Sequence, residues 1–97
     1  MGEARQIRGE LTRLALAQVL RVRIAAKRLR QTDVARSSGI SRTYLLSLLG
    51  AKKQVSLFVF LELSRGLGFE DEREFMHAVL QERDKLRQIR LRGGTPQ

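Results

Sequence analysis

The sequence lacks several residue types that small proteins use for chemistry. Its 97 residues include no cysteine, one histidine and one proline. Without cysteine, neither a disulfide framework nor a thiolate metal site can form. A membrane-spanning helix needs about 18 consecutive apolar residues, and no uncharged apolar run in the sequence approaches that length. The first residues do not have the pattern of a signal peptide. We therefore expect a cytoplasmic protein with no membrane span, no metal and no cofactor.

Motifs for catalysis are also missing. The sequence contains no nucleophile–base pair and no glycine-rich loop that could cradle a phosphate. The single histidine, His77, has no carboxylate or cysteine at metal-ligand spacing, so we expect it at a surface or interface. Four phenylalanines and one tyrosine are few for a module that stacks RNA bases. These absences argue against an enzyme and disfavour RNA binding.

Positive charge, in contrast, is abundant and unevenly placed. The net charge is +9, and residues 1–53 hold 12 Lys and Arg against three acids, whereas residues 54–97 hold seven of each sign. Fifteen of the 19 cations are arginine, which suits bidentate contacts to phosphate or guanine. Because neutralised phosphates release counterions and so drive association, the first half of the chain is predicted to bind a polyanion.

The spacing of apolar residues predicts one all-α domain of five helices and no strand. We expect helices over residues 10–28, 31–38, 42–49, 56–67 and 70–90. Ser41 and Ser56 are good N-cap residues for the third and fourth of these. Residues 1–9 are expected to form a flexible arm, and residues 93–97 a disordered tail.

Residues 31–50, Q-T-D-V-A-R-S-S-G-I-S-R-T-Y-L-L-S-L-L-G, carry the most informative pattern. Two helices that cross steeply over a short turn nearly touch, so the contact needs a small residue, here Ala35. The turn needs a positive φ, which Gly39 adopts without a Cβ penalty. This pattern predicts a helix-turn-helix, with an ordinary helical hairpin as the alternative. The apolar positions predicted to face the core are Val34, Ile40, Leu45 and Leu48.

At G-I-S-R-T-Y-L-L-S, residues 39–47, the chain resembles the lambda-repressor-like family of helix-turn-helix proteins, of the Cro or XRE type. Residues 56–68 are similar to the fourth helix of that family, and the resemblance covers about residues 11–69. It implies a DNA-binding domain over residues 10–69, followed by a further helix over residues 70–92. It also implies a recognition helix whose N-terminal end enters the major groove of double-stranded DNA.

The resemblance assigns roles to individual residues. Base readout falls on Arg42, Thr43, Leu46 and Ser47, and Arg42 can fork onto guanine O6 and N7. Tyr44 is expected either to reach a phosphate or to cap the core as a half-buried aromatic residue, and each lysine of the group could simply be solvated. The expected phosphate contacts are Arg30, Gln31, Ser41, Tyr44, Lys52 and Lys53.

Two positions depart from the family pattern. Many relatives bury an arginine–glutamate pair at the positions that align with Ile24 and Leu49, so a hydrophobic contact is expected here instead. The glycine that usually follows aligns with Ala51, although Gly50 beside it could take the same role. The geometry of the loop that carries the two lysines depends on this choice.

The last helix carries an apolar seam formed by Phe75, Val79, Leu86 and Ile89. The first helix has a second apolar stripe at Leu16, Leu20 and Ile24. The seam either folds back onto this stripe or pairs with a second subunit. Because a lone recognition helix reads only a few base pairs, we expect a homodimer that spans two half-sites. The expected dimer interface is Leu16, Leu20, Phe75, Val79, Leu86 and Ile89.

These observations predict a transcriptional regulator, by default a repressor, that binds a palindromic operator as a homodimer. Its size and arginine content would suit a phage, plasmid or other mobile element. The alternative is an antitoxin-like or anti-activator protein that acts mainly by binding a partner protein through its first and last helices. The stripe at Leu16, Leu20 and Ile24 is the feature that would serve this alternative.

Overall fold

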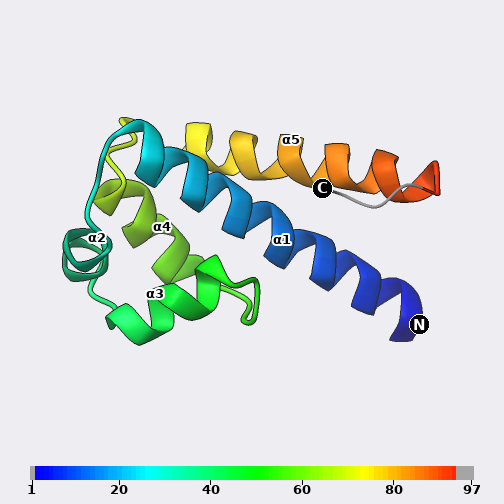
Figure 1. Ribbon diagram of the computed structural model, residues 1–97, viewed down its shortest axis with the longest axis horizontal. Helices are drawn as coiled ribbons and strands as arrows, with labels where there is room; N and C mark the ends of the chain where they lie inside the picture. Colours follow the sequence, from blue (N-terminus) through cyan, green and yellow to red (C-terminus); the bar gives the residue numbers. More distant parts are fainter. Residues whose placement is uncertain (1, 94–97) are drawn as a thin grey trace.

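Two long helices and three short ones build the molecule, which we describe from a computed structural model over residues 2–93 (Figure 1). The helices α1 and α5 run side by side in opposite directions, and α2, α3 and α4 pack at one end of this pair. The expectation of an all-α fold with five helices is confirmed. The helices are α1 (Gly2–Ala26), α2 (Gln31–Ser37), α3 (Arg42–Leu49), α4 (Leu57–Gly66) and α5 (Glu72–Leu91).

Side-chain caps set the starts of the later helices. Ser41 Oγ accepts a hydrogen bond from the Tyr44 amide at 3.0 Å, and Ser56 Oγ accepts one from the Val59 amide at 3.1 Å. Asp71 caps α5 in the same way. Each bond satisfies an amide that the first turn leaves without an intrahelical partner, and losing such a cap costs about 1 kcal/mol. The two predicted serine caps are confirmed.

The turn between α2 and α3 has the local features predicted from the sequence. Gly39 has φ +69°, and Ala35 is buried at 3% exposure beneath the turn. The amide of Ile40 donates to the Ala35 carbonyl at 3.0 Å, which closes the turn between α2 and α3. Because this turn fixes the angle at which α3 leaves α2, it decides which face of α3 is presented outward. The predicted core positions are buried or half-buried: Val34, Ile40, Leu45 and Leu48.

The core joins α5 to the rest of the domain through aromatic stacking. The ring of Phe75, which is fully buried, lies 4.2 Å from that of Phe60 and 5.1 Å from that of Phe69. Leu20 of α1 and Leu63 of α4 are fully buried in the same core. Burial of each such side chain contributes about 1.5–3 kcal/mol, so α5 is an integral part of the domain.

Five of the six residues expected at a dimer interface are buried within the single chain. The apolar seam of α5 folds back on its own chain, where α1 and α5 form the most extensive helix pair. Large side chains at these positions are withdrawn from water by intrachain packing, which leaves little of their surface for a second copy. The buried residues are Leu16, Leu20, Phe75, Val79 and Leu86, and Ile89 is half-buried.

The ends of the chain also differ from expectation. The chain is helical from Gly2, so the flexible arm expected over residues 1–9 becomes the first turns of α1. Residues 3–6 are good helix formers, and the Gln54 side chain donates to the Gly9 carbonyl at 2.9 Å. Of the expected tail, residue 93 follows α5 in a turn, and residues 94–97, like residue 1, lie outside the described residues.

At the positions that depart from the pattern of the resembled family, apolar side chains are buried or half-buried and Ala51 takes an unusual backbone conformation. Ile24 is half-buried against the core and Leu49 is buried, as expected for a hydrophobic replacement. In addition, the Arg21 side chain donates to the Leu49 carbonyl at the end of α3. Ala51, not Gly50, takes the left-handed conformation, with φ +57°. None of the helices within residues 2–93 is long and apolar enough to cross a membrane.

Candidate nucleic-acid interface

The outward face of α3 is the surface on which the predicted base-reading residues lie. Arg42, Thr43 and Leu46 are exposed, and Ser47 is half-buried. The hydroxyl of Ser47 donates to the Thr43 carbonyl at 3.2 Å, so its proton is occupied by the helix itself. The structure therefore brings the four residues together on one face. Arg42, the first residue of α3, is exposed to solvent.

The opposite face of α3 is anchored in the core. Leu45 and Leu48 are at most 1% exposed, and the capping bond to Ser41 Oγ holds the first turn. The cap uses the Ser41 hydroxyl oxygen as an acceptor, so the hydroxyl proton is left to donate to an external acceptor such as a phosphate oxygen. A helix fixed on one side and polar on the other is a rigid platform, which recognition at hydrogen-bond precision requires.

The predicted phosphate contacts flank α3 on two sides. Arg30, at the N-cap position of α2, is exposed and makes no side-chain cap bond, and Gln31 begins α2 half-buried. Lys52 and Lys53 are both exposed in the loop between α3 and α4. Tyr44 packs half-buried against the core, with the Lys53 ammonium 5.9 Å from its ring centroid. Both expected roles of Tyr44 remain compatible with this position.

The loop that carries the lysines is ordered by backbone hydrogen bonds. The Lys52 amide donates to the Ser47 carbonyl at 2.9 Å, and the Ala51 amide donates to the Leu48 carbonyl at 3.1 Å. These bonds satisfy carbonyls at the end of α3, as in a left-handed helix terminus. The two lysines are thereby held directly after α3.

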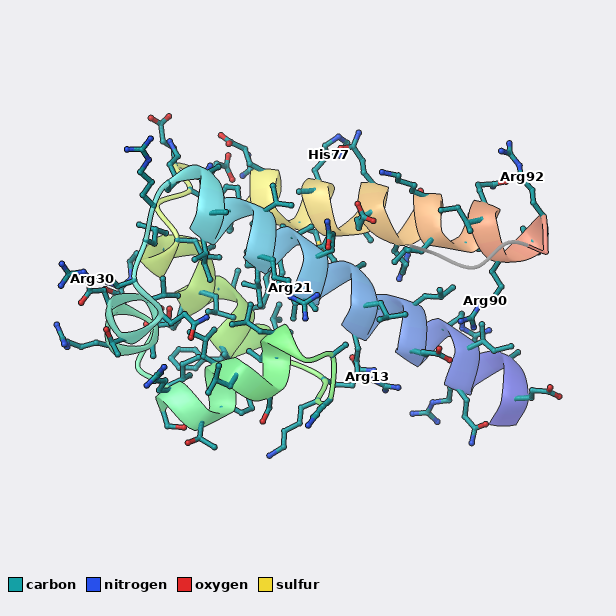
Figure 2. The ribbon with its side chains drawn as sticks, in the orientation of Figure 1. Arg13, Arg21, Arg30, His77, Arg90 and Arg92 are labelled. Carbon is teal, nitrogen blue, oxygen red and sulfur yellow. The ribbon has the colours of Figure 1, made fainter. Side chains whose placement is uncertain are left out.

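A basic extension of this surface lies on α1 and was not predicted from the sequence. Arg5 and Arg13 line a recess together with Gln54, which follows the two lysines in the loop. Figure 2 shows Arg13 directed from α1 toward the end of the α3–α4 loop. The signal that could have revealed these residues is the helix-forming composition of residues 3–8, which extends α1 past the loop.

Charge is one-sided around the candidate interface. No acidic residue occurs between Asp33 and Glu62, a stretch that contains α3 and the lysine loop. Asp33 is ion-paired with Arg36 at 3.4 Å. On α1, a hydrogen bond from Arg90, together with the positive charges of Arg90 and Arg13, lowers the pKa of Glu10 below its ordinary value.

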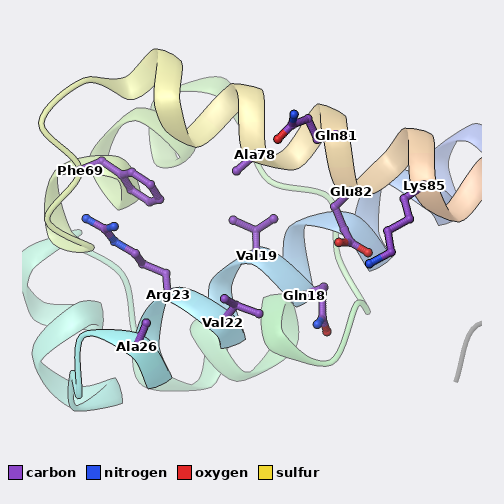
Figure 3. A pocket seen from close by; sticks show the side chains of 10 residues that line it. All are labelled: Gln18, Val19, Val22, Arg23, Ala26, Phe69, Ala78, Gln81, Glu82 and Lys85. Carbon is purple, nitrogen blue, oxygen red and sulfur yellow. The ribbon is translucent and has the colours of Figure 1, made fainter.

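A second recess lies between α1 and α5, and Figure 3 shows its lining. Arg23 closes one end. It donates to the Leu67 carbonyl at 3.0 Å and to the Gly68 carbonyl at 2.8 Å, and it stacks 3.9 Å from the Phe69 ring centroid. This arginine therefore satisfies two carbonyls at the end of α4. Within residues 2–93, no group of three or more acidic, histidine or cysteine side chains could hold a metal ion.

No protein-family model, curated protein or solved structure matches the chain. The resemblance to the lambda-repressor-like family therefore stays a prediction, carried by the motif residues themselves.

Proposed function

We propose that the protein is a sequence-specific DNA-binding transcriptional regulator of the cytoplasm, a repressor that binds a palindromic operator as a homodimer. The observation that carries this proposal is the exposed face of α3. It begins at a capped N-terminus with Arg42, is anchored by a buried opposite face, and lies in a stretch without any acidic residue. Such a helix meets the steric and electrostatic demands of the major groove.

Each part of the surface has a distinct task in this proposal. Arg42 reads guanine through two parallel hydrogen bonds, Thr43 bonds a base edge or packs its methyl group, and Leu46 packs against a thymine methyl. Contacts to phosphate set the register of α3 without reading sequence. These come from Lys52 and Lys53 after α3 and from Arg30 and Gln31 at the start of α2.

The basic half of α1 adds to non-specific affinity. Arg5 and Arg13 extend the positive surface beyond the lysine loop. Each phosphate that they neutralise makes binding more dependent on salt concentration. Binding in this account should therefore weaken steeply as salt is raised, for operator and random DNA alike.

The alternative, an antitoxin-like or anti-activator protein, loses its main support. That reading relied on the stripe of Leu16, Leu20 and Ile24 as a contact surface for a partner protein. In the structure Leu16 and Leu20 are buried, and Ile24 is half-buried against the core. A partner could not reach Leu16 and Leu20 without displacing the side chains packed on them.

The proposal is tested by selecting DNA from a random pool with the purified protein and measuring affinities for the enriched sequence. Arg42→Ala should weaken the operator by about 1–3 kcal/mol, roughly 5- to 150-fold, and leave random DNA nearly unaffected. Arg92→Ala is the matched control, because it removes the same charge at the far end of α5 (Figure 2). If no sequence is enriched, or if Arg42→Ala leaves the preference unchanged, the proposal fails.

A further inference from the structure

The outer surface of α4 and α5 leaves a group of large apolar side chains in water. Together they expose on the order of 500 Å², taking about 200 Å² for each side chain when fully exposed. Patches of this size lie at the upper end of the range for monomers and mark contact sites. We call this the α4–α5 patch, and it consists of Leu57 (69% exposed), Phe58 (71%), Leu61 (39%), Met76 (38%) and Leu80 (38%).

The patch is continuous across the two helices. Leu57, Met76 and Leu80 line one recess between the start of α4 and the first half of α5. Leu61 lies one turn after Leu57 on the same side of α4, and Phe58 lies next to them. None of these side chains is used by α3 or by the lysine loop in the proposed DNA contact.

Opposite charges adjoin the two ends of the patch. At one end, Leu61 lines a recess with Glu62, Glu70 and Glu72. Residues 62–74 there hold five acids and two bases, a net charge of −3. At the other end, Arg83 lines the same recess as Leu57. Arg87 lies one turn after Arg83 on the same side of α5.

A surface with this order of charges is complementary to itself. A two-fold axis at a right angle to α5 turns the helix end for end in the second copy, so the acidic end of one patch meets the basic end of the other. The apolar centre of the patch then meets its own equivalent. A standard interface buries about 800 Å² on each partner, which the apolar centre and its charged rim together can supply.

We propose that a second copy of this chain covers the α4–α5 patch across such an axis, with Glu70 and Glu72 of each copy facing Arg83 and Arg87 of the other. The inference rests on the proposed function, since a palindromic operator needs two copies related by a two-fold axis. In Figure 1, α3 and α5 lie at opposite edges of the molecule. An axis that runs from the α5 edge to the α3 edge leaves both α3 helices on the same side, where one DNA duplex can meet them.

Charge reversal on the full-length chain tests the interface, with mass measured by size-exclusion chromatography and light scattering. One variant carries Arg83→Glu and Arg87→Glu, and the other carries Glu70→Lys and Glu72→Lys. None of the four residues is buried, so both variants should fold, which circular dichroism checks. Lys85→Glu is the matched control, because Lys85 lines the recess on the opposite side of α5.

The wild type and the control should be dimers, and each double variant alone should be a monomer, with a dissociation constant raised at least tenfold. Mixing the two variants should restore a dimer, because both pairs of contacts then join opposite charges. The proposal is overturned by a monomeric wild type, by variants that remain dimers alone, or by a mixture that stays monomeric.

DNA binding separates this proposal from the proposed function. If the wild type is monomeric but still enriches one half-site from a random pool, the interface is refuted and DNA recognition stands. If the mixture of variants restores the dimer but no sequence is enriched by the wild type, the interface stands and the proposed function fails. Phe58→Ser provides an independent variant at the apolar centre, and it should also give a monomer.

Discussion

Replacing Ala51 by glycine should stabilise the protein, although glycine substitutions usually destabilise. Ala51 has φ +57° in the loop that holds the two lysines after α3. The left-handed conformation costs an L-residue about 1–2 kcal/mol. Glycine has more conformational freedom in the unfolded chain, which reduces the stabilisation from relieving this strain by about 0.5–1 kcal/mol. We therefore expect Ala51→Gly to raise the free energy of unfolding by about 0.5–1 kcal/mol.

Two matched variants make this prediction specific. Ala25→Gly introduces the same chemical change at an exposed position in the last turn of α1, where it should lower the free energy of unfolding by up to about 1 kcal/mol. Gly50→Ala tests the neighbouring residue, whose φ is −87° and whose added Cβ would lie 3.4 Å from the Leu46 carbonyl oxygen. It should be neutral or slightly stabilising, because it restricts the unfolded chain.

Thermal and urea denaturation followed by circular dichroism measure these differences. A domain of this size shifts its Tm by about 4–8 °C for each kcal/mol, so Ala51→Gly should raise the Tm by about 2–8 °C. Destabilisation by Ala51→Gly equal to that by Ala25→Gly would refute the left-handed geometry of the loop, and with it the placement of the lysines.

Three further outcomes are expected. Gly66→Ala should lower the free energy of unfolding by about 1–3 kcal/mol in denaturation experiments, because its Cβ would collide with Ser38 Oγ, and Ser38→Ala should recover part of this loss. Arg90 lowers the pKa of Glu10, so the ion pair stabilises the fold above the ordinary pKa of 4.5, and this contribution disappears as the pH falls below that value. The difference in unfolding free energy between the wild type and Glu10→Gln should therefore vanish in acid. A difference that stays unchanged across that pH range would contradict the contact. Lys52→Ala should weaken binding to all DNA sequences alike and reduce the salt slope by about one unit in titrations, whereas an effect on only one sequence would reassign this lysine to base readout.

The turn region could be predicted because its rules are local. A positive φ at Gly39 and side-chain caps at Ser41 and Ser56 depend on residues within one helical turn, and all three are present. The buried positions of α3 follow from helical spacing in the same way. This is why the helix that carries the candidate interface is placed with its expected bounds, residues 42–49.

The sequence of an apolar helix face, in contrast, does not show which surface packs against it. The seam of α5 would look the same if it packed on α1 or on a second subunit. In the structure the seam packs on α1, and Phe75 at its start stacks with Phe60 and Phe69. The surface that remains exposed, around Leu57 and Phe58, is visible only after this packing is known.

Choices between neighbouring residues also needed the structure. Gly50 and Ala51 could both have ended α3, and glycine is the usual choice for a left-handed residue. The bond from the Lys52 amide to the Ser47 carbonyl places the left-handed conformation at Ala51 instead. The hydrogen bond from Arg23 to the end of α4 likewise joins residues 44 positions apart, and a local sequence pattern cannot predict such a contact.

The central claim is that α3 enters the major groove of duplex DNA, and a single-thiol cleavage experiment tests it most directly. The chain has no cysteine, so Thr43→Cys creates a unique site for an iron chelate that cleaves nearby DNA. Bound to the selected operator, this probe should cleave at two places roughly 34–36 Å apart, one for each copy. The same chelate on His77→Cys, on the outer side of α5, should cleave far less (Figure 2). Cleavage from position 43 no stronger than from position 77 would contradict the account.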